Sequence, residues 1–309
     1  MCRVLAYMGR PVVLDDLLFQ PDCSLVRQTI HPRMLHLLNL AGFGLVAWDA
    51  RSHHPEQPYI YRSTDLPIFD RNLKALAEKL TADAVIAHIR GVPYHNRVTV
   101  GEQNLHPFRF DGVPLALAHN GDLAGFDRMR YALVPHMKPD VASRIRGNTD
   151  SEWIYALLLS QLDDPTRRPG LDRLRAAVVR TLSILREVRQ AHGLSTSSAT
   201  NLFIGDGQSL VVVRFTFDFG CYDTEDAARL QEAQLNYLSL WYTTGQSYGC
   251  YDGEWRTRGG PRRTDAVLVS SEPLTQDVSS WMEVPEYALL WVDRASDGHQ
   301  TLGTLPLEV

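Results

Sequence analysis

Two long helical segments in the middle of the chain, with short apolar segments before and after them, most constrain the fold. The helical segments begin at residues 150 and 171, and Gly193 follows the second one. Apolar runs typical of strands occur at residues 42–49, 59–63, 84–90, 113–119, 237–243, 266–271 and 287–293. Residues 70–82 have the spacing of a further helix. Regular strand–helix alternation is absent, so the pattern predicts an antiparallel α+β domain.

Three remaining features complete the expected organisation. An Asp206–Gly207 pair between two apolar runs is typical of a hairpin. Residues 219–232 and 245–264 are polar or rich in glycine, and we interpret both as loops within one fold. We expect a single domain over residues 2–292 and a short C-terminal tail over residues 293–309.

Composition and charge exclude several classes of protein. The formal net charge is -5 from 31 basic and 36 acidic residues, which does not suggest a nucleic-acid or polybasic membrane surface. No apolar run approaches the length of about 20 residues needed to span a membrane, and the first apolar run is too short for a signal peptide. The four cysteines form no CxxC pair, so a reducing cytoplasm is the expected location.

Cys2 is the first candidate for chemistry, because only Met1 precedes it. Removal of Met1 gives one residue with both a thiol and a free α-amine. Such an amine has a reference pKa of about 7.7–8.0, close to working pH, and is able to serve as the general base for its own thiol. With Met1 attached, the Cys2 nitrogen is an amide and has no such role.

Four further segments carry candidate polar residues, and each also has a structural explanation. Arg90 ends the run AVIAHIR, where an arginine is commonly a surface group. Asn120–Gly121 follows an apolar run, as in a type I′ turn. Thr149 and Asp150 open a helix, and TDSE resembles a capping box. NLHPF contributes one of several histidines, whose spacing matches no metal-ligand pattern, so we expect no metal and no cofactor.

The order of these segments behind Cys2 resembles the class II glutamine amidotransferases, whose domain belongs to the N-terminal nucleophile hydrolases. The matching segments are MCR, GFGLVAW, HIR, NLHPF, AHNGDL and TDSE. The resemblance implies a four-layer αββα sandwich of two antiparallel sheets. Similar small stand-alone members include the γ-glutamyl amidase of ergothioneine biosynthesis and a γ-glutamyl-peptide subunit used in glutathione breakdown. The start MCR and the closing SSEPL and WMEVP favour this group.

The resemblance also implies a role for each candidate residue. Cys2 attacks the γ-amide and forms a thioester, while Asn120 and Gly121 hold the oxyanion. Arg90 binds the α-carboxylate of the substrate, and Asp150 binds its α-ammonium group. His88 is a structural residue or lines the pocket, whereas Ser270, Ser271 and Glu272 are structural supports.

Three functions stay open at the level of sequence. The chain is an amidase that cuts glutamine or another small γ-glutamyl compound, which is the interpretation we favour. Alternatively, it supplies ammonia to a partner synthase, or works beside a peptidase subunit, because no synthase part and no ATP-binding G-x-x-x-x-G-K-[ST] motif is present. A third alternative is an inactive γ-glutamyl-binding module.

Overall fold

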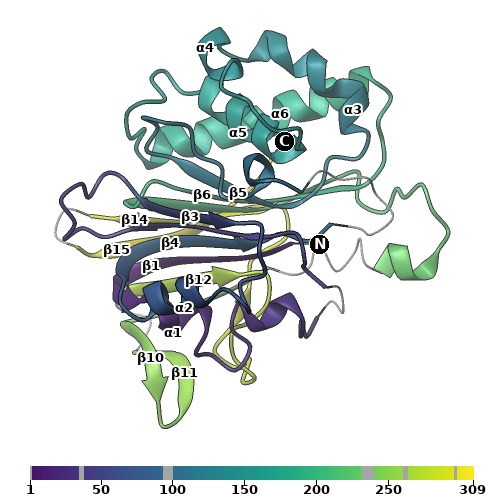
Figure 1. Ribbon diagram of the computed structural model, residues 1–309. Helices are drawn as coiled ribbons and strands as arrows, with labels where there is room; N and C mark the ends of the chain where they lie inside the picture. Colours follow the sequence, from purple (N-terminus) through teal and green to yellow (C-terminus); the bar gives the residue numbers. More distant parts are fainter. Residues whose placement is uncertain (1, 35–37, 93–99, 232–239, 260–263, 296–297) are drawn as a thin grey trace.

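A computed structural model describes residues 2–34, 38–92, 100–231, 240–259, 264–295 and 298–309. Two antiparallel sheets lie face to face in it, and helices cover the outer face of each sheet (Figure 1). The predicted α+β class and its four-layer αββα order are therefore confirmed.

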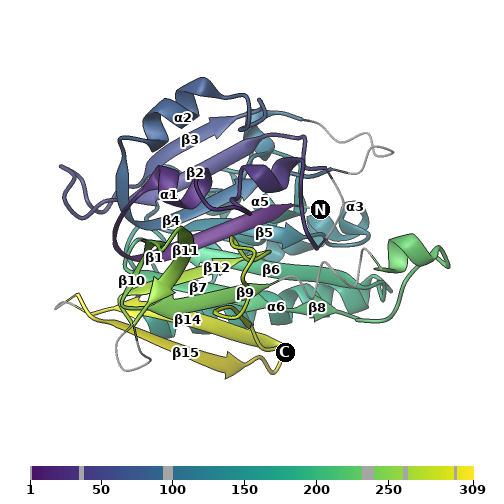
Figure 2. The ribbon, with the colours of Figure 1, turned by 90° about the horizontal axis from the view of Figure 1, so that it is seen from below.

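The first sheet contains β1, which follows Cys2 directly. In the described part of the chain its strand order is β13-β9-β12-β1-β4-β2-β3. The bounds are β1 Arg3–Val13, β2 Phe43–Trp48, β3 Tyr59–Ser63, β4 Thr81–Ile89, β9 Trp241–Gly245, β12 Ala266–Ser270 and β13 Met282–Glu283. Because β1 lies between β4 and β12, the chain start is placed in the centre of the sheet (Figure 2).

The second sheet has the order β15-β14-β7-β6-β5 in the described residues, and β8 pairs with β6. The bounds are β5 Ala116–Gly121, β6 Ser198–Gly205, β7 Ser209–Arg214, β8 Thr216–Phe217, β14 Ala288–Arg294 and β15 Gln300–Pro306. The helices are α1 Leu14–Leu18, α2 Arg71–Ala77, α3 Phe126–Met129, α4 Pro139–Ala142, α5 Asp150–Ser160 and α6 Leu171–Ala191, with 3-10 turns at Arg27–Thr29, Glu102–Asn104 and Arg130–His136.

Alternation along β1 explains the layering. Val4, Ala6 and Met8 belong to the apolar cluster between the two sheets. Leu5 and Tyr7 point to the opposite face, where they join the cluster beneath α1 and α2. A strand buried on both faces reads as a continuous apolar run, which matches the sequence after Cys2. The third cluster packs α5 and α6 against the outer face of the second sheet.

Most predicted elements are confirmed, with shifted boundaries. The expected strands at 42–49, 59–63, 84–90, 113–119, 266–271 and 287–293 correspond to β2, β3, β4, β5, β12 and β14. The helix expected over 70–82 ends at Ala77, because β4 already begins at Thr81. Part of the strand expected at 237–243 lies outside the described residues, and β9 begins at Trp241.

Two segments differ from the sequence interpretation. Residues 245–264 were expected to be a loop, but Ser247–Tyr251 and Glu254–Arg258 pair as the hairpin β10–β11. The turn at Asp252 and Gly253 has positive φ at both residues, as this kind of hairpin requires. Residues 300–306 form β15 along the edge of β14, so part of the expected tail adds a strand to the second sheet. The domain boundary at residue 292 stays a prediction.

Candidate functional site

Cys2 lies half-buried at the start of β1, beside the end of β4. Its Sγ atom donates a hydrogen bond to the carbonyl oxygen of Gly91 over 3.7 Å. The pairing of Arg3 with Ile89 brings the two strand ends together. The candidate nucleophile and the residue after Arg90 are therefore in contact, although 89 positions separate them.

A buried ion pair holds the backbone around Cys2. Arg3 Nη2 lies 2.7 Å from Glu272 Oε1, and both side chains are almost fully buried. Arg3 Nη1 also donates to the carbonyl oxygen of Cys2 at 3.1 Å. The second oxygen of Glu272 accepts from the Arg33 backbone nitrogen at 2.8 Å. Glu272 thus has a structural role, as the sequence suggested, and acts on the backbone of the nucleophile through Arg3.

Arg90 follows β4 directly and is 4% exposed. Its backbone is fixed by bonds from Arg90 N to Gly42 O at 2.8 Å and from Ala41 N to Arg90 O at 3.0 Å. Burial lowers the pKa of Arg90, whereas the negative charges of Cys2 and Asp150 oppose this shift. The guanidinium group therefore lies within electrostatic range of both the candidate nucleophile and the candidate ammonium-binding carboxylate.

Asn120 and Gly121 are the last two residues of β5, so the alternative of a type I′ turn is wrong. Asn120 Nδ2 donates to Ser271 Oγ at 3.1 Å, and the same oxygen accepts from Val4 N at 3.1 Å. Ser271 thereby joins Asn120 of the second sheet to the strand that begins with Cys2. The Oδ1 atom of Asn120 is buried and has no hydrogen-bond partner among the described residues.

Gly121 occupies a position that only glycine fits. Its φ is 154°, and a Cβ atom there would lie 1.8 Å from the carbonyl oxygen of Ala199. Real Cβ atoms do not approach backbone oxygens so closely, so any side chain would force the strands apart. The end of β5 can therefore keep its pairing with β6 only with glycine at this position.

Asp150 opens α5, and Thr149 caps that helix by accepting from Glu152 N at 3.3 Å. The carboxylate of Asp150 accepts from Leu123 N at 2.7 Å and from Ser151 N at 2.8 Å. Glu152 does not complete the expected capping box, because its oxygens accept from the backbone nitrogens of Arg146 and Gly147. The helix start thus orients Asp150, while Glu152 fixes the preceding loop.

Three histidines near the candidate site residues in the sequence, His88, His106 and His119, are buried. The rings of His88 and His106 stack with centroids 4.1 Å apart, and the ring nitrogens of His106 have no hydrogen-bond partner among the described residues. His119 contacts Ser151 Oγ at 3.0 Å through Nδ1. Burial lowers the pKa of all three side chains. They are packing residues in the neutral form, which agrees with the structural interpretation of His88.

Sequence reasoning did not single out Ser151. Ser151 is an ordinary second residue of a helix, and nothing local marks its contact with His119 across the layer. Among the described residues, no group of three or more His, Cys, Asp or Glu side chains lies in position to hold a metal ion. No helix of the described chain has the length and apolar character needed to cross a membrane.

Most of the aromatic segment 241–255 lies away from Cys2. Tyr248 Oη donates to the carbonyl oxygen of Asp16, beyond the far end of β1. Tyr248 packs beside Trp255 in the β10–β11 hairpin, which Figure 1 shows projecting from the sandwich. Trp241 is different, because it pairs with Ser270 at the end where Cys2 lies.

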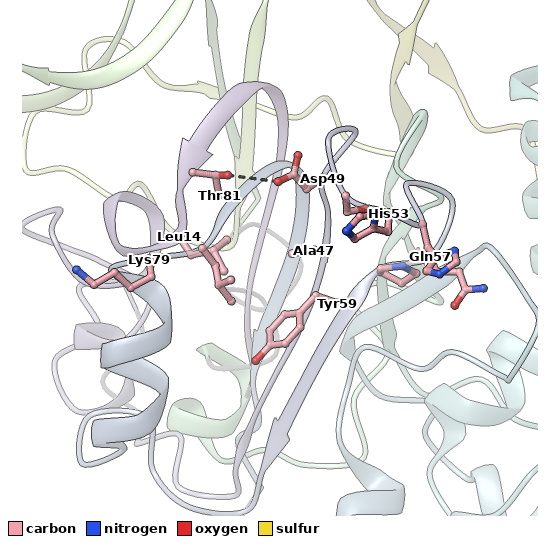
Figure 3. Close-up of a pocket in the computed structure, with 12 residues that line it drawn as sticks. Leu14, Ala47, Asp49, His53, Gln57, Tyr59, Lys79 and Thr81 are labelled. Atoms are coloured by element: carbon pink, nitrogen blue, oxygen red, sulfur yellow. Dashed lines mark hydrogen bonds between the residues drawn. The ribbon is translucent and has the colours of Figure 1, made fainter.

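A cavity of about 500 Å³ lies at the far end of the first sheet (Figure 3). It is lined by Ala47, Asp49, His53, Tyr59 and Thr81, among others, and Asp49 accepts from Thr81 Oγ1 at 3.3 Å. Ala47 lies at the opposite end of β2 from Phe43, which neighbours Ile89 and Arg3. This cavity therefore shares nothing with the candidate site.

Comparisons with known proteins agree with this arrangement. The profile of the family described as "Glutamine amidotransferases class-II" matches residues 70–218. The "Probable glutamine amidotransferase DUG3" of Saccharomyces cerevisiae is 30% identical over 312 residues, covering 95% of this chain and 82% of the yeast protein.

Solved structures show the same fold. A "glutamine aminotransferase class-II domain protein" from Silicibacter pomeroyi superposes with a TM-score of 0.59 at 20% identity, and each chain is covered fully. The glutamine phosphoribosylpyrophosphate amidotransferase of B. subtilis superposes with a TM-score of 0.58 at 17% identity, but only 50% of that chain is covered.

The sandwich and its relatives define an enzyme of the N-terminal nucleophile hydrolase type. More narrowly, the chain belongs to the class II glutamine amidotransferases. Membership of this family supports hydrolysis of the amide of glutamine by a nucleophilic cysteine.

Proposed function

We propose that this protein hydrolyses the γ-glutamyl amide bond of glutamine or a small γ-glutamyl compound through a thioester on Cys2. The observation that carries this proposal is the contact between Cys2 Sγ and Gly91 O, directly after Arg90. Asn120 reaches the same end of the sandwich through Ser271 and Val4. These contacts support a site that draws on three distant segments of the chain.

The reaction needs one base, and the α-amine of Cys2 supplies it once Met1 is removed. The amine takes the thiol proton, and the sulfur forms a bond to the γ-carbonyl carbon. The proton then goes to the departing nitrogen as the C–N bond breaks. Water attacks the thioester with the amine again as base, and the thiol and the γ-carboxylate are released.

The oxyanion of each tetrahedral intermediate is bound by Asn120 and Gly121 in this proposal. Asn120 Nδ2 has two hydrogens, and the bond to Ser271 uses one of them. The second is left for the substrate oxygen, together with the backbone N–H of Gly121. Removal of one such donor costs about 3–4 kcal/mol of barrier in another enzyme.

The α-carboxylate and α-ammonium groups of the substrate are assigned to Arg90 and Asp150. The charge of Asp150 raises the pKa of Arg90, so the two groups lie near each other and bear opposite signs. A zwitterionic amino-acid head fits this pair, whereas a peptide-bound glutamine lacks both free groups. The proposed selectivity is therefore for free γ-glutamyl compounds.

The enzyme is proposed to act in the cytoplasm without a cofactor, as a small amidase of the kind found in ergothioneine biosynthesis. All four cysteines are free, in keeping with a reducing compartment. The family domain is proposed to span residues 2–292. Delivery of ammonia to a synthase partner, or work beside a peptidase subunit, is the second candidate, since the chain covers only half of the B. subtilis amidotransferase.

The test is a kinetic comparison of purified protein on glutamine and a panel of γ-glutamyl amines, thiols and peptides. Intact-mass measurement of the same sample is expected to show that Met1 is absent. Cys2→Ala is expected to lose at least about a thousandfold in kcat, whereas Cys221→Ala, at an exposed cysteine, keeps the wild-type rate. Retained Met1 in an active sample, or an active Cys2→Ala variant, would overturn the mechanism.

The same panel separates the alternatives. Turnover by the isolated chain favours the amidase, and turnover that requires a second protein favours the ammonia-supplying subunit. Saturable binding of glutamine with no turnover under either condition would indicate a binding module.

A further inference from the structure

A second cavity, of about 680 Å³, lies beside α5 and contains none of the five proposed site residues. It is lined by Arg62, Glu102, Gln103, Phe108, Arg109, Phe110, Asp111, Ser143, Arg144, Arg146 and Glu152. Arg62 of β3 lies in a row with Gly44, His88 and Val4 across four strands. The backbone of Arg62 is thus about 14 Å from β1, at a strand spacing of about 4.8 Å.

Four arginines line this cavity, and none of them forms an ion pair with a carboxylate of the described residues. Arg62 donates to the carbonyl oxygen of Pro107, and Arg144 Nη1 donates to the carbonyl oxygen of Asp111 at 2.9 Å. The Nε atoms of Arg62 and Arg109 are buried without any hydrogen-bond acceptor. Buried donors of charged groups are costly when unpaired, so this arrangement favours an external acceptor.

Three of the arginines come from separate segments of the chain and lie near the same residue, Tyr155. The positive charges of Arg109, Arg62 and Arg144 all act on the phenol of Tyr155, which is buried in α5. Burial lowers the pKa of Arg62, the nearby carboxylates of Glu152 and Glu102 oppose this shift, and the charge of Arg109 adds to it. Four arginines thus share one cavity with fewer carboxylates, and an excess of positive charge attracts an anion.

The carboxylates of the cavity offset these charges only in part. Glu152 is buried and acts electrostatically on Arg62 and Arg146, but its oxygens accept from the backbone, from Arg146 N at 3.0 Å and Gly147 N at 2.6 Å. Glu102 and Asp111 are exposed at the rim. None of these carboxylates forms an ion pair with the four arginines among the described residues, so the guanidinium groups have donors left beyond the two that bond to the carbonyl oxygens of Pro107 and Asp111.

A third cavity provides a comparison within the same molecule. It has a volume of about 450 Å³ and is also lined by four arginines, Arg167, Arg168, Arg173 and Arg180. There Arg167 pairs with Asp164 at 3.3 Å, and Arg173 lies 4.0 Å from Asp163. These two arginines are 85% and 74% exposed, so this is an ordinary solvated surface.

We propose that the cavity beside α5 binds a small molecule through a diphosphate or phosphate-ester group held by Arg62, Arg109 and Arg144. Guanidinium groups match the oxygens of a phosphate group with paired, charge-assisted hydrogen bonds. The volume falls within the range of about 300–1,000 Å³ that is usual for small-molecule sites. The site is separate from the amidase chemistry, so its test does not depend on the proposed function.

The test is isothermal titration calorimetry of the full chain with inorganic pyrophosphate, with inorganic phosphate and citrate as parallel titrants. Pyrophosphate is expected to bind saturably at one site, in wild-type protein and in Cys2→Ala alike, and more weakly at high salt. The double variant Arg109→Ala/Arg144→Ala is expected to weaken binding by at least about tenfold, and Arg173→Ala/Arg180→Ala to leave it unchanged.

If the double variant does not fold, Arg146→Glu tests the same site, because it changes an exposed side chain at the rim. This variant is expected to keep the wild-type unfolding temperature and to bind pyrophosphate at least about tenfold more weakly. The proposal is overturned if wild-type protein does not bind pyrophosphate, if Arg146→Glu binds it as tightly as wild type, or if citrate binds more tightly than pyrophosphate.

Discussion

The Nδ1 atom of His119 lies 3.0 Å from the Oγ atom of Ser151, linking the second sheet to α5 next to Asp150. His119 Nε2 lies 3.3 Å from the carbonyl oxygen of Ala199, which only accepts, so the neutral ring carries its proton on Nε2. Nδ1 is then an acceptor. The single hydroxyl hydrogen of Ser151 has two acceptors within reach, His119 Nδ1 at 3.0 Å and Asp150 Oδ1 at 3.1 Å. Asp150 also accepts from two backbone donors, Leu123 N and Ser151 N.

Replacement of Ser151 by alanine is expected to lower the free energy of unfolding by about 1–3 kcal/mol, because it removes the hydroxyl that lies between the buried His119 Nδ1 and Asp150 Oδ1. Chemical denaturation measures the change. Ser183→Ala is the control, since its hydroxyl donates only to Val179 O within its own helix. Equal destabilisation by the two variants would show that the His119 contact adds nothing to stability.

Gly121→Ala is expected to destabilise the protein by more than about 3 kcal/mol, because the new Cβ atom meets the carbonyl oxygen of Ala199 at 1.8 Å. Gly112→Ala is a matched control, with a φ of 73° and no atom within 4 Å of the added Cβ. Only the left-handed backbone cost of about 1–2 kcal/mol applies there. Similar thermal unfolding of both variants would contradict the steric argument.

Arg90→Lys is expected to raise the KM for glutamine by about 10- to 100-fold, because a lysine cannot form two parallel hydrogen bonds to the α-carboxylate. A glutamine analogue without the α-carboxylate provides the control substrate. Its kcat/KM is expected to change little, so the preference for glutamine narrows. An equal loss on both substrates would assign Arg90 to structure rather than to carboxylate binding.

The ordered motifs were sufficient to predict the family and the fold, whereas the site assigned to Cys2, Arg90 and Asp150 stays a prediction. They work because each motif ends or begins a strand or helix, and the sandwich brings those ends together. The bond between Asn120 and Ser271 was not predictable in the same way, since 151 positions separate the partners. Their contact follows from the stacking of two sheets, which no local pattern encodes.

The missed elements have physical reasons as well. The β10–β11 hairpin is rich in glycine, arginine and tyrosine, and its strands are largely solvent-exposed, so no apolar alternation marks them. β15 is an edge strand with four exposed or half-exposed residues at its centre, 302–305. The arginine cavity joins residues from β3, the loop before β5 and the loop before α5, each of which looks like an ordinary surface charge in sequence.

Arg3→Met is expected to cost about 3–5 kcal/mol of stability, because it leaves the buried carboxylate of Glu272 without its charged partner. Amidase activity is expected to fall as well, since Arg3 also holds the carbonyl oxygen of Cys2. Arg167→Met is the control: Arg167 lies 3.3 Å from Asp164, and the two side chains are 85% and 48% exposed, so about 0–1 kcal/mol is expected. Denaturant unfolding measures both losses. Equal losses of stability in the two variants would contradict the claim that the buried ion pair contributes more than the exposed one.

The buried histidines are expected to make the protein less stable in mild acid. Burial, together with the charge of Arg90, lowers the pKa of His88 from 6.5 to about 3, and His106 stacks on it. In the unfolded chain His88 therefore binds a proton near pH 6.5, whereas in the folded chain it binds one only near pH 3. The stability from neutral His88 is complete above pH 6.5 and is lost progressively as the pH falls toward 3.

One such group changes the free energy of unfolding by up to about 1.4 kcal/mol per pH unit within this window. His88→Gln is expected to reduce the slope of that free energy against pH between about 6.5 and 5. The reduction corresponds to one proton fewer taken up on unfolding, even if the variant is less stable throughout. His54→Gln, at a side chain that is 76% exposed, serves as the control and should leave the slope unchanged. An identical slope in wild type and His88→Gln would mean that His88 takes up its proton without unfolding.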